Sequence, residues 1–484
     1  MRYAAVIKLL GVLLMLFSLS MIPPMVVAVV YHEAVLDSFI AGFFLALILG
    51  FCLWVPFSRA TPEMRNRDGF LVVVLFWVVL SLFGAIPFYF NLFHQIDFTE
   101  AFFESTSGLT TTGASILSNL DHMPRALLYY RQQLQLLGGM GIIVLAIAIM
   151  PMLGMGGMTL YRAEAAGPFK NDKVKPRLAE TAKALWYIYV GLTILCILSF
   201  WLAGMDIFDA VGEAYGTIST GGFNMHDQSF AFYHSNSISI IAMVFMLLGA
   251  FQFSLHFNFI WHRDLSIYFK DPELRGYIKI LVVAILLVLL ILYIHDFNQR
   301  PHSHMVMDAF FTVISVATTT GSSVTNFISW PTFLPFLVMF LALIGGCGGS
   351  TSGGIKVVRM LLLKEQGKRE IQRLIHPNLV MSIKLGDQVV PENIIQGIWG
   401  YFAIYIVLFV VLLLLLLATG LDLTTAFGAL SACISDAGQS IGLAGDSYAL
   451  LPDSSKWVLI FAMLAGRLEI FTLIVIFVPS FWKK

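Results

Sequence analysis

Four stretches of this sequence each place a hydroxyl-bearing residue three positions before a glycine, in a polar patch between long apolar segments. The hydroxyl residues and glycines pair as Thr110 with Gly113, Ser219 with Gly222, Thr318 with Gly321 and Ser435 with Gly438. Glycine adopts backbone angles that side chains forbid, so such a segment can turn its carbonyl groups inward. Rings of backbone carbonyls can replace the hydration shell of a cation. The pattern therefore indicates coordination of a small, weakly hydrated monovalent cation.

The four stretches align without a gap, and each has an alanine twelve positions before its glycine. They read DFTEAFFESTSGLTTTGAS (97–115), DIFDAVGEAYGTISTGGFN (206–224), MVMDAFFTVISVATTTGSS (305–323) and DLTTAFGALSACISDAGQS (422–440). Asp97, Asp206 and Asp422 are predicted N-caps of short helices. Roughly 12 residues of helix rise only ~18 Å, half a membrane. We expect segments that enter a membrane and return. The alternative, four polar external loops, needs neither matched helix starts nor a shared glycine.

The remainder of the chain indicates an integral membrane protein. Of its 484 residues, 58% are hydrophobic and 12% are charged, against roughly 25% charged in soluble domains. Because about 20 apolar residues span a bilayer as a helix, we predict ten spans, near residues 4–30, 36–57, 69–91, 124–157, 176–204, 234–261, 277–295, 332–363, 394–420 and 456–481. The run 405–418 is apolar on every side, which excludes the alternating strands of a β-barrel. The expected fold is an all-α polytopic membrane protein.

The distribution of positive charge predicts the orientation, because Lys and Arg favour the cytoplasmic side. With the N-terminus inside, all of the 29 Lys and Arg residues fall on one side except Arg125, Arg131, Arg300, Lys456 and Arg467. Both termini are therefore expected to be cytoplasmic. The first apolar run is too long for a cleaved signal and shows no convincing cleavage site, and the scattered cysteines indicate neither a disulfide framework nor a zinc site.

Asp436 interrupts the pattern, because the other three stretches carry threonine at this position. A divalent-selective site would be expected to use rings of carboxylates, and this position supplies only one. Two interpretations are open: the carboxylate attracts cations, or it holds the turn through hydrogen bonds.

The eighth predicted span contains GGCGGSTSGG (345–354), with six glycines that each cost ~1 kcal/mol in a helix relative to alanine. We therefore expect the helix to break there. The phosphate-binding pattern GxxxxGK[ST] is absent, so no nucleotide site is predicted in this chain. Close packing of helices through small residues is the structural alternative.

Arg467 is the one Lys or Arg near the middle of a predicted span, where an unpaired charge costs ~2.5 to 3.5 kcal/mol. A structural ion pair is one explanation, although Glu469 is a poor partner because residues two apart do not share a helix face. The basic segment 356–377 has two interpretations: an ordinary cytoplasmic loop, or a docking surface for a soluble regulatory subunit.

The four turns resemble those of the Trk/Ktr/HKT superfamily of potassium transporters, and the whole chain resembles its bacterial TrkH family. The resemblance rests on the repeats, the turns TTTG, STGG and TTTG, the break GGCGGSTSGG and the final AGRLE. It implies two extra helices (1–66) and four helix, pore-loop, helix repeats around one pseudo-fourfold pore (67–170, 171–270, 271–385 and 386–484). It also implies a homodimer in the bacterial inner membrane with a cytosolic, nucleotide-binding TrkA-type ring as regulator. Glycine at the first turn goes with potassium over sodium in that family, and the fourth turn departs from its TG pattern.

Carried onto this sequence, the resemblance implies three sets of site residues. The potassium-binding filter comprises Thr110, Thr111, Thr112, Gly113, Ile218, Ser219, Thr220, Gly221, Gly222, Thr318, Thr319, Thr320, Gly321, Ser435, Asp436, Ala437 and Gly438. The gate below it is a loop comprising Gly345, Gly346, Gly348, Gly349, Ser350, Thr351, Ser352, Gly353 and Gly354. Arg467 projects into the conduction path, where a cation ~10 Å away would feel roughly 1.7 kcal/mol of repulsion at an effective dielectric of ~20.

Potassium is therefore the expected ion, with rubidium as a second permeant ion, and no nucleic acid is expected as a partner. The main hypothesis is a passive, gated pore. The alternative is an alternating-access symporter coupled to protons or sodium, although such proteins usually have inverted or two-part repeats. A receptor without transport explains neither the repeats nor Arg467, and the spans lack the clustered acids, histidines or nucleophiles of an enzyme.

Overall fold

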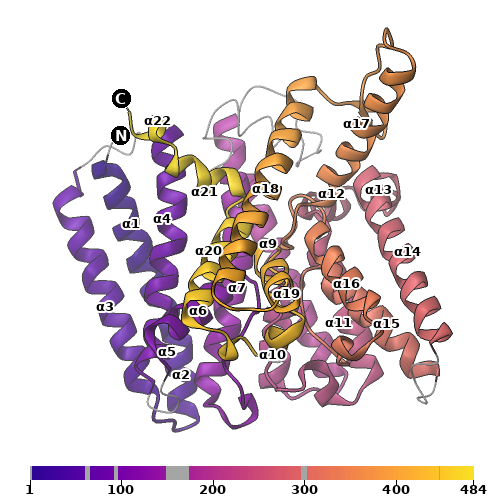
Figure 1. Cartoon of the computed structure of the whole chain (residues 1–484). Helices are drawn as coiled ribbons and strands as arrows, with labels where there is room; N and C mark the ends of the chain where they lie inside the picture. The colour runs from indigo at the N-terminus through magenta and orange to yellow at the C-terminus, as the bar shows by residue number, and fades with distance from the viewer. Residues whose placement is uncertain are drawn as a thin grey trace.

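The computed structural model describes residues 3–59, 66–91, 96–148, 174–295, 302–445 and 447–483. In these residues the chain is mostly helical, and the strands are β1 (Lys384–Leu385) and β2 (Gln388–Val389), which form one antiparallel hairpin. Figure 1 shows the two termini close together at one end of the molecule. Helix α17 (Val357–Ile375) projects from the same end.

Six of the described segments are long and apolar enough to cross a membrane, or up to eight if each bent pair is one span. The six contain α1 (Tyr3–Ser18) with α2 (Ile22–Val30), α3 (Leu36–Trp54), α4 (Asn66–Gly84) with α5 (Ile86–Tyr89), α9 (Val174–Leu202), α14 (Pro272–Ile294) and α18 (Glu392–Ala418). The bent pairs are α11 (Asn236–Ala250) with α12 (Phe253–His262), and α20 (Asp453–Arg467) with α21 (Ile470–Phe477).

The other two predicted spans differ from a simple apolar helix. The fourth corresponds to α7 (Arg125–Ala148), and its last predicted residues, 149–157, lie outside the described part of the chain. The eighth is interrupted: α16 (Phe333–Ile344) ends at the glycine-rich segment, and α17 begins after it. The expected break is confirmed, and the total of ten spans stays a prediction.

The chain between the apolar segments is built from shorter helices. They are α13 (Ser266–Lys270), α22 (Pro479–Trp482) and the 3₁₀ helices η1 (Leu19–Met21), η2 (Val55–Phe57), η3 (Leu120–His122), η5 (Ser229–Tyr233), η6 (Phe327–Ser329), η7 (Gly442–Gly445) and η8 (Tyr448–Leu450).

The expected short helices are present in all four repeats. They are α6 (Phe98–Leu109), α10 (Ile207–Ile218), α15 (His302–Ala317) and α19 (Leu423–Ile434). Three begin at the predicted N-caps, since Asp97, Asp206 and Asp422 accept hydrogen bonds from first-turn amides at 2.7, 3.1 and 3.0 Å. Helix α15 lacks an aspartate at that position and begins earlier in the chain.

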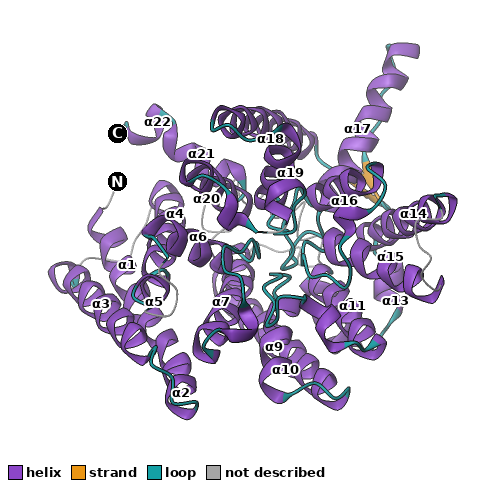
Figure 2. Ribbon diagram, turned by 60° about the horizontal axis from the view of Figure 1, so that its bottom comes forward, coloured by secondary structure: helices purple, strands orange, loops and turns teal. Residues whose placement is uncertain are grey.

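The two ends of the chain pack together. One buried apolar cluster contains Phe17 and Phe39 from the N-terminal helices, Tyr130 from α7, and Leu416 and Leu459 from α18 and α20. Helices from the two ends of the chain are therefore neighbours. Figure 2 shows the result from another side: helices surround a central group of loop segments.

Helix α11 ends in a bend that the sequence analysis did not predict, because span 234–261 was expected to be one helix. The axes of α11 and α12 differ by 96°. The broken ends find partners in the glycine-rich segment: Cys347 N donates to Ala250 O at 3.0 Å, and Phe253 N donates to Gly349 O at 3.1 Å. The bend is stable because a segment far away in the sequence satisfies its backbone groups.

Candidate ion filter and intramembrane loop

The four short helices end at matching positions, four residues before the glycine of each stretch. Their last residues are Leu109, Ile218, Ala317 and Ile434. The carbonyl end of a helix carries partial negative charge. Four such ends directed at the central loops favour a cation there (Figure 2).

The turns that follow repeat the same backbone conformation. In each turn the residue two positions before the glycine has a positive φ: 55° at Thr111, 50° at Thr220, 56° at Thr319 and 52° at Asp436. The glycines also have positive φ: 81° at Gly113, 78° at Gly222, 77° at Gly321 and 66° at Gly438. Positive φ is unusual for residues with side chains, so four matched pairs show one backbone design used four times.

The four glycines contact one another's turns in cyclic order. A Cβ atom built on Gly113 would lie 2.2 Å from Gly221 O, and one on Gly222 would lie 1.8 Å from Thr320 O. One on Gly321 would lie 2.0 Å from Ala437 O, and one on Gly438 would lie 2.3 Å from Thr112 O. Each carbonyl belongs to the residue before the next glycine, and the fourth contact returns to the first turn. This closed circuit requires glycine at all four places.

The structure therefore brings all seventeen predicted filter residues together. All are buried except Gly113, which is half-buried. Thr110 and Thr112 share a hydrogen bond at 2.7 Å, and Thr318 and Thr320 share the corresponding bond at 2.8 Å. These hydroxyl pairs stiffen the first and third turns.

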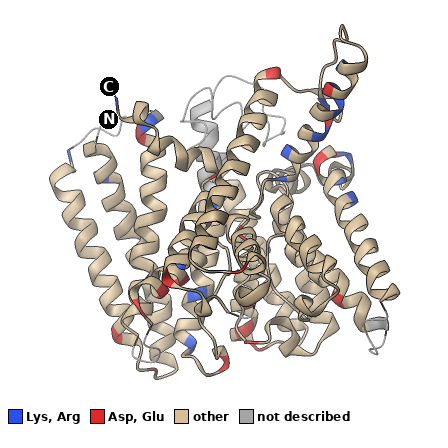
Figure 3. Ribbon diagram, viewed as in Figure 1, with Lys and Arg blue, Asp and Glu red and all other residues tan. Residues whose placement is uncertain are grey.

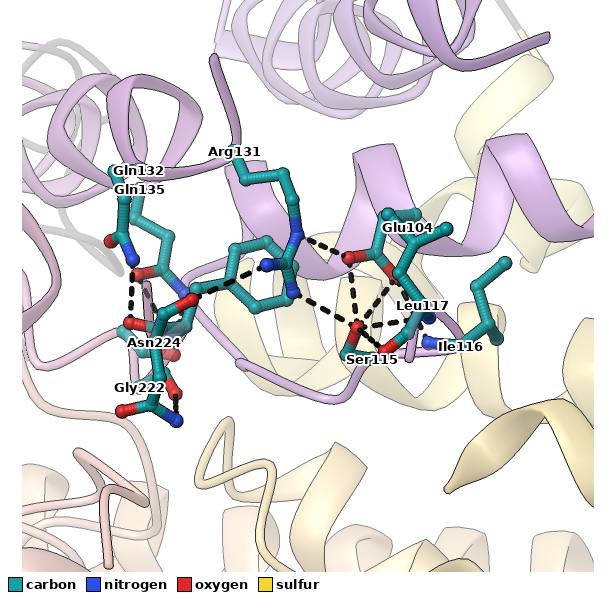
Figure 4. A network of polar contacts seen from close by, with 11 residues as sticks. Glu104, Ser115, Ile116, Leu117, Arg131, Gln132, Gln135, Gly222 and Asn224 are labelled. Carbon is teal, nitrogen blue, oxygen red and sulfur yellow. Dashed lines mark hydrogen bonds and ion pairs between the residues drawn. The ribbon is translucent and has the colours of Figure 1, made fainter. Parts of the chain in front are cut away.

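Polar residues of α7 brace the second turn, and the sequence analysis missed them. Gln135 donates to Gly221 O at 2.7 Å and accepts from Phe223 N at 3.2 Å, so one amide binds both sides of Gly222. Gln132 donates to Phe223 O at 2.8 Å. Figure 4 shows both glutamines beside this turn. The available signal was the run RQQLQ inside an apolar span, because polar side chains at membrane depth need partners.

Asp436 connects the fourth turn to the first. Its Oδ1 accepts a hydrogen bond from Thr112 Oγ1 at 2.9 Å. Its Oδ2 has no hydrogen-bond partner in the described part of the chain and lies 3.3 Å from the position of a Cβ on Gly466 in α20. The carboxylate thus contacts the neighbouring turn and the supporting helix, which favours the turn-holding interpretation.

Asp436→Asn tests that interpretation. Asparagine keeps the shape and an oxygen that can accept from Thr112, while it removes the charge. We expect rubidium uptake and the preference for potassium over sodium to stay within about threefold of the wild type, a difference below ~0.7 kcal/mol. The measurement is uptake into proteoliposomes with competing ions. A clear loss of ion preference would instead assign the carboxylate to cation attraction.

The glycine-rich segment between α16 and α17, residues 345–356, lies against three of the turns, at the end where each turn leaves its short helix. Thr351 Oγ1 donates to Ile218 O at 3.0 Å, and Ser352 Oγ donates to Thr318 O at 2.5 Å. A Cβ on Gly353 would overlap Ser435 O, so the segment also meets the fourth turn. The predicted gate residues therefore lie next to the filter. We call residues 345–356 the intramembrane loop.

A carboxylate that the sequence analysis missed binds both this loop and the first turn of α17. Glu273 is buried in the first turn of α14. Its Oε1 accepts from Gly348 N at 2.7 Å and from Val358 N at 3.1 Å. Nothing local in the sequence signals these contacts, because they join segments about 80 residues apart.

The side chain of Arg467 binds backbone carbonyl groups of the loop and of α7. Its two terminal nitrogens donate to Thr351 O at 3.0 Å and to Gly138 O of α7 at 3.1 Å. No carboxylate in the described part of the chain lies within ion-pair distance of it, while Glu469 pairs with Arg359 at 2.8 Å. The structural ion pair considered for Arg467 is therefore absent from this arrangement, and its charge lies beside the loop under the turns.

Comparisons with known proteins agree on one family. A family model described as "TrkH: Cation transport protein" matches residues 36–484. The Trk system potassium uptake protein TrkH of Salmonella typhimurium is 47% identical over the full length of both chains. The Trk system potassium uptake protein TrkG of Escherichia coli K12 is 38% identical, covering 98% of this chain and 97% of that protein. The crystal structure of the potassium transporter TrkH from Vibrio parahaemolyticus superimposes with a TM-score of 0.92, at 45% identity and with complete coverage of both chains.

Proposed function

Because this chain belongs to the TrkH family of cation transport proteins, we propose that it takes up potassium across the bacterial inner membrane through a channel-like filter. The chain is a transporter and not an enzyme. The observation that carries the proposal is the closed circuit of glycine and carbonyl contacts among the four turns. Such a circuit presents matched carbonyls around one axis, which is the arrangement that replaces the hydration shell of a potassium ion.

The proposed architecture has ten spans: two extra helices (1–66) followed by four pore repeats with one pseudo-fourfold axis (67–170, 171–270, 271–385 and 386–484). Four short helices, three of them with aspartate N-caps, and four matched turns support it. The boundary between the first two repeats falls outside the described residues. The predicted orientation, with cytoplasmic termini, is supported by Figure 3, in which Lys and Arg of α17 lie at the end of the molecule that carries both termini.

The intramembrane loop is the proposed gate, and Arg467 is the proposed barrier beside it. The support is their position: the loop contacts Ile218 and Thr318 at the inner ends of two turns, and Arg467 holds Thr351. A fixed positive charge on the path opposes the passage of cations. Rubidium, which is chemically close to potassium, is expected to follow the same path.

The proposed assembly is a homodimer regulated by a cytosolic TrkA-type ring, on which the regulatory nucleotide binds. Helix α17 supports a cytosolic docking surface because it projects from the molecule and exposes apolar residues among its basic ones. Ile371, Leu374 and Ile375 are 63%, 85% and 67% exposed. Apolar side chains left in water on a projecting helix indicate a surface for a partner.

The test is uptake of rubidium into proteoliposomes that contain the purified chain, with potassium, sodium or lithium as competitors. We expect potassium to compete best and uptake to follow the rubidium gradient without a proton gradient. The alternative function is a symporter coupled to protons or sodium. Uptake that ignores the rubidium gradient and requires a proton or sodium gradient would replace the passive pore with that alternative.

A further inference from the structure

Two buried glutamates occupy the same place in the first two repeats. Glu104 in α6 and Glu213 in α10 each lie nine residues before the glycine of their turn, Gly113 or Gly222. Both side chains are fully buried. A buried carboxylate is costly unless it is hydrogen-bonded, so two at one repeat position call for a shared reason.

Each glutamate binds the chain that leaves its turn. Glu104 Oε2 accepts from Ile116 N at 3.0 Å, and Glu213 Oε1 accepts from Met225 N at 2.9 Å. Both amides lie three residues after the glycine. Hydrogen bonds to a carboxylate are stronger than neutral ones, so each bond fastens the outer end of a turn to the helix that precedes it.

The third and fourth repeats have no such acid. Their matching residues are Thr312 and Ala429. Other groups fasten these turns: Ser315 Oγ donates to Ser322 O at 2.6 Å, and Tyr448 OH donates to Gly438 O at 2.9 Å. We call the hydrogen bond between the glutamate and the chain after its turn the carboxylate clamp. It is present in the first two turns of the proposed filter.

The two glutamates differ in their other contacts. Glu104 pairs with Arg131 at 2.8 Å, and Arg131 also donates to Ser115 Oγ at 2.9 Å and to Asn224 O at 3.4 Å (Figure 4). Glu213 has no ion pair in the described residues, and its Oε2 lacks a hydrogen-bond partner there. Its second contact is Tyr233 OH at 3.4 Å. The hydrogen bond between Glu213 and Met225 N can therefore be changed without breaking an ion pair.

We propose that Glu104 and Glu213 are positioning residues that set ion selection, because their bonds to Ile116 N and Met225 N fix the spacing of the filter carbonyls. A turn held at both ends cannot close around a cation smaller than potassium, so sodium is coordinated poorly. If the hydrogen bond between the glutamate and the backbone amide is lost, the carbonyls can move inward, and the filter then coordinates sodium more favourably. The inference rests on the proposed function, since it names what maintains the selectivity of that filter.

Two conservative variants of Glu213 separate position from charge. Glu213→Gln removes the charge but keeps the length and an oxygen that accepts from Met225 N. Glu213→Asp keeps the charge but is one methylene shorter and withdraws the acceptor from the amide. Thr312→Ala is the matched control, because it changes the same repeat position where no clamp exists. Each full-length protein is assayed in proteoliposomes for inhibition of rubidium uptake by potassium and by sodium.

We expect Glu213→Asp to lower the preference for potassium over sodium about tenfold, as the loss of one charge-assisted hydrogen bond allows. Glu213→Gln and Thr312→Ala should stay within about threefold of the wild type. A purely structural role would change the amount of folded protein without changing this preference, so melting temperature is measured on the same samples.

The proposal is overturned if Glu213→Asp keeps the preference for potassium, or if Glu213→Gln loses it, which would assign the effect to the charge. These outcomes are distinct from failure of the proposed function. If the proposed function were wrong, the wild type itself would not prefer potassium over sodium.

Discussion

Gly222→Ala is expected to lower potassium-competed rubidium uptake about 100-fold, which corresponds to about 2.7 kcal/mol. The added Cβ would lie 1.8 Å from Thr320 O. Since atoms cannot approach so closely, the second and third turns must move apart, and the carbonyls of Gly221 and Thr320 then leave their places. A filter depends on those positions, so the loss should be large in protein that is still made and folded.

Gly204→Ala is the matched control for this variant. Gly204 also has a positive φ, 98°, but a Cβ there would meet nothing within 4 Å. Backbone strain is therefore similar in the two variants, about 1 to 2 kcal/mol, while only Gly222→Ala disturbs the turns. Uptake is measured at equal amounts of reconstituted protein. Equal uptake by the two variants would show that the circuit of contacts is not needed for transport.

Arg467→Ala is expected to raise rubidium flux by up to about tenfold. The side chain is buried beside the intramembrane loop, and its hydrogen bonds go to two backbone carbonyls and to no acid. A positive charge ~10 Å from a passing cation adds roughly 1.7 kcal/mol of repulsion at an effective dielectric of ~20. Removing it lowers this barrier and also releases Thr351 of the loop.

Two further variants separate these effects. Arg467→Lys keeps the charge and should leave flux near the wild-type value, whereas Arg467→Gln keeps hydrogen-bond donors without charge and should behave like alanine. The measurement is the initial rate of rubidium uptake at equal protein abundance. A rate for Arg467→Ala that equals or falls below that of the wild type would contradict the barrier role.

The features that the sequence predicts well are those encoded locally. The aspartate N-caps, the lengths of α6, α10 and α19, and the break after Ile344 all depend on residues within one or two turns of helix. The shared glycine was visible because the chain repeats it four times. Local chemistry repeated in one sequence can be read without knowledge of the fold.

The missed features depend on which segments become neighbours. Arg131 was counted only as a charge near the outer face, yet it is buried against Glu104. The bend after Ala250 has no proline or glycine at the break itself, and its backbone partners come from the intramembrane loop. Likewise, the two contacts of Arg467 join α20 to residues 116 and 329 positions away. Contacts of this kind have no local sequence signal.

The central claim, that the four turns form one potassium filter, is tested most directly by locating the ion. Anomalous diffraction from crystals of the protein grown in rubidium should show a peak enclosed by the carbonyls of Thr112, Gly221, Thr320 and Ala437, whose oxygens face the circuit of glycines. The peak should fall when potassium replaces rubidium, because potassium occupies the same site. Rubidium bound only elsewhere in the molecule, with no peak among these four carbonyls, would contradict the account.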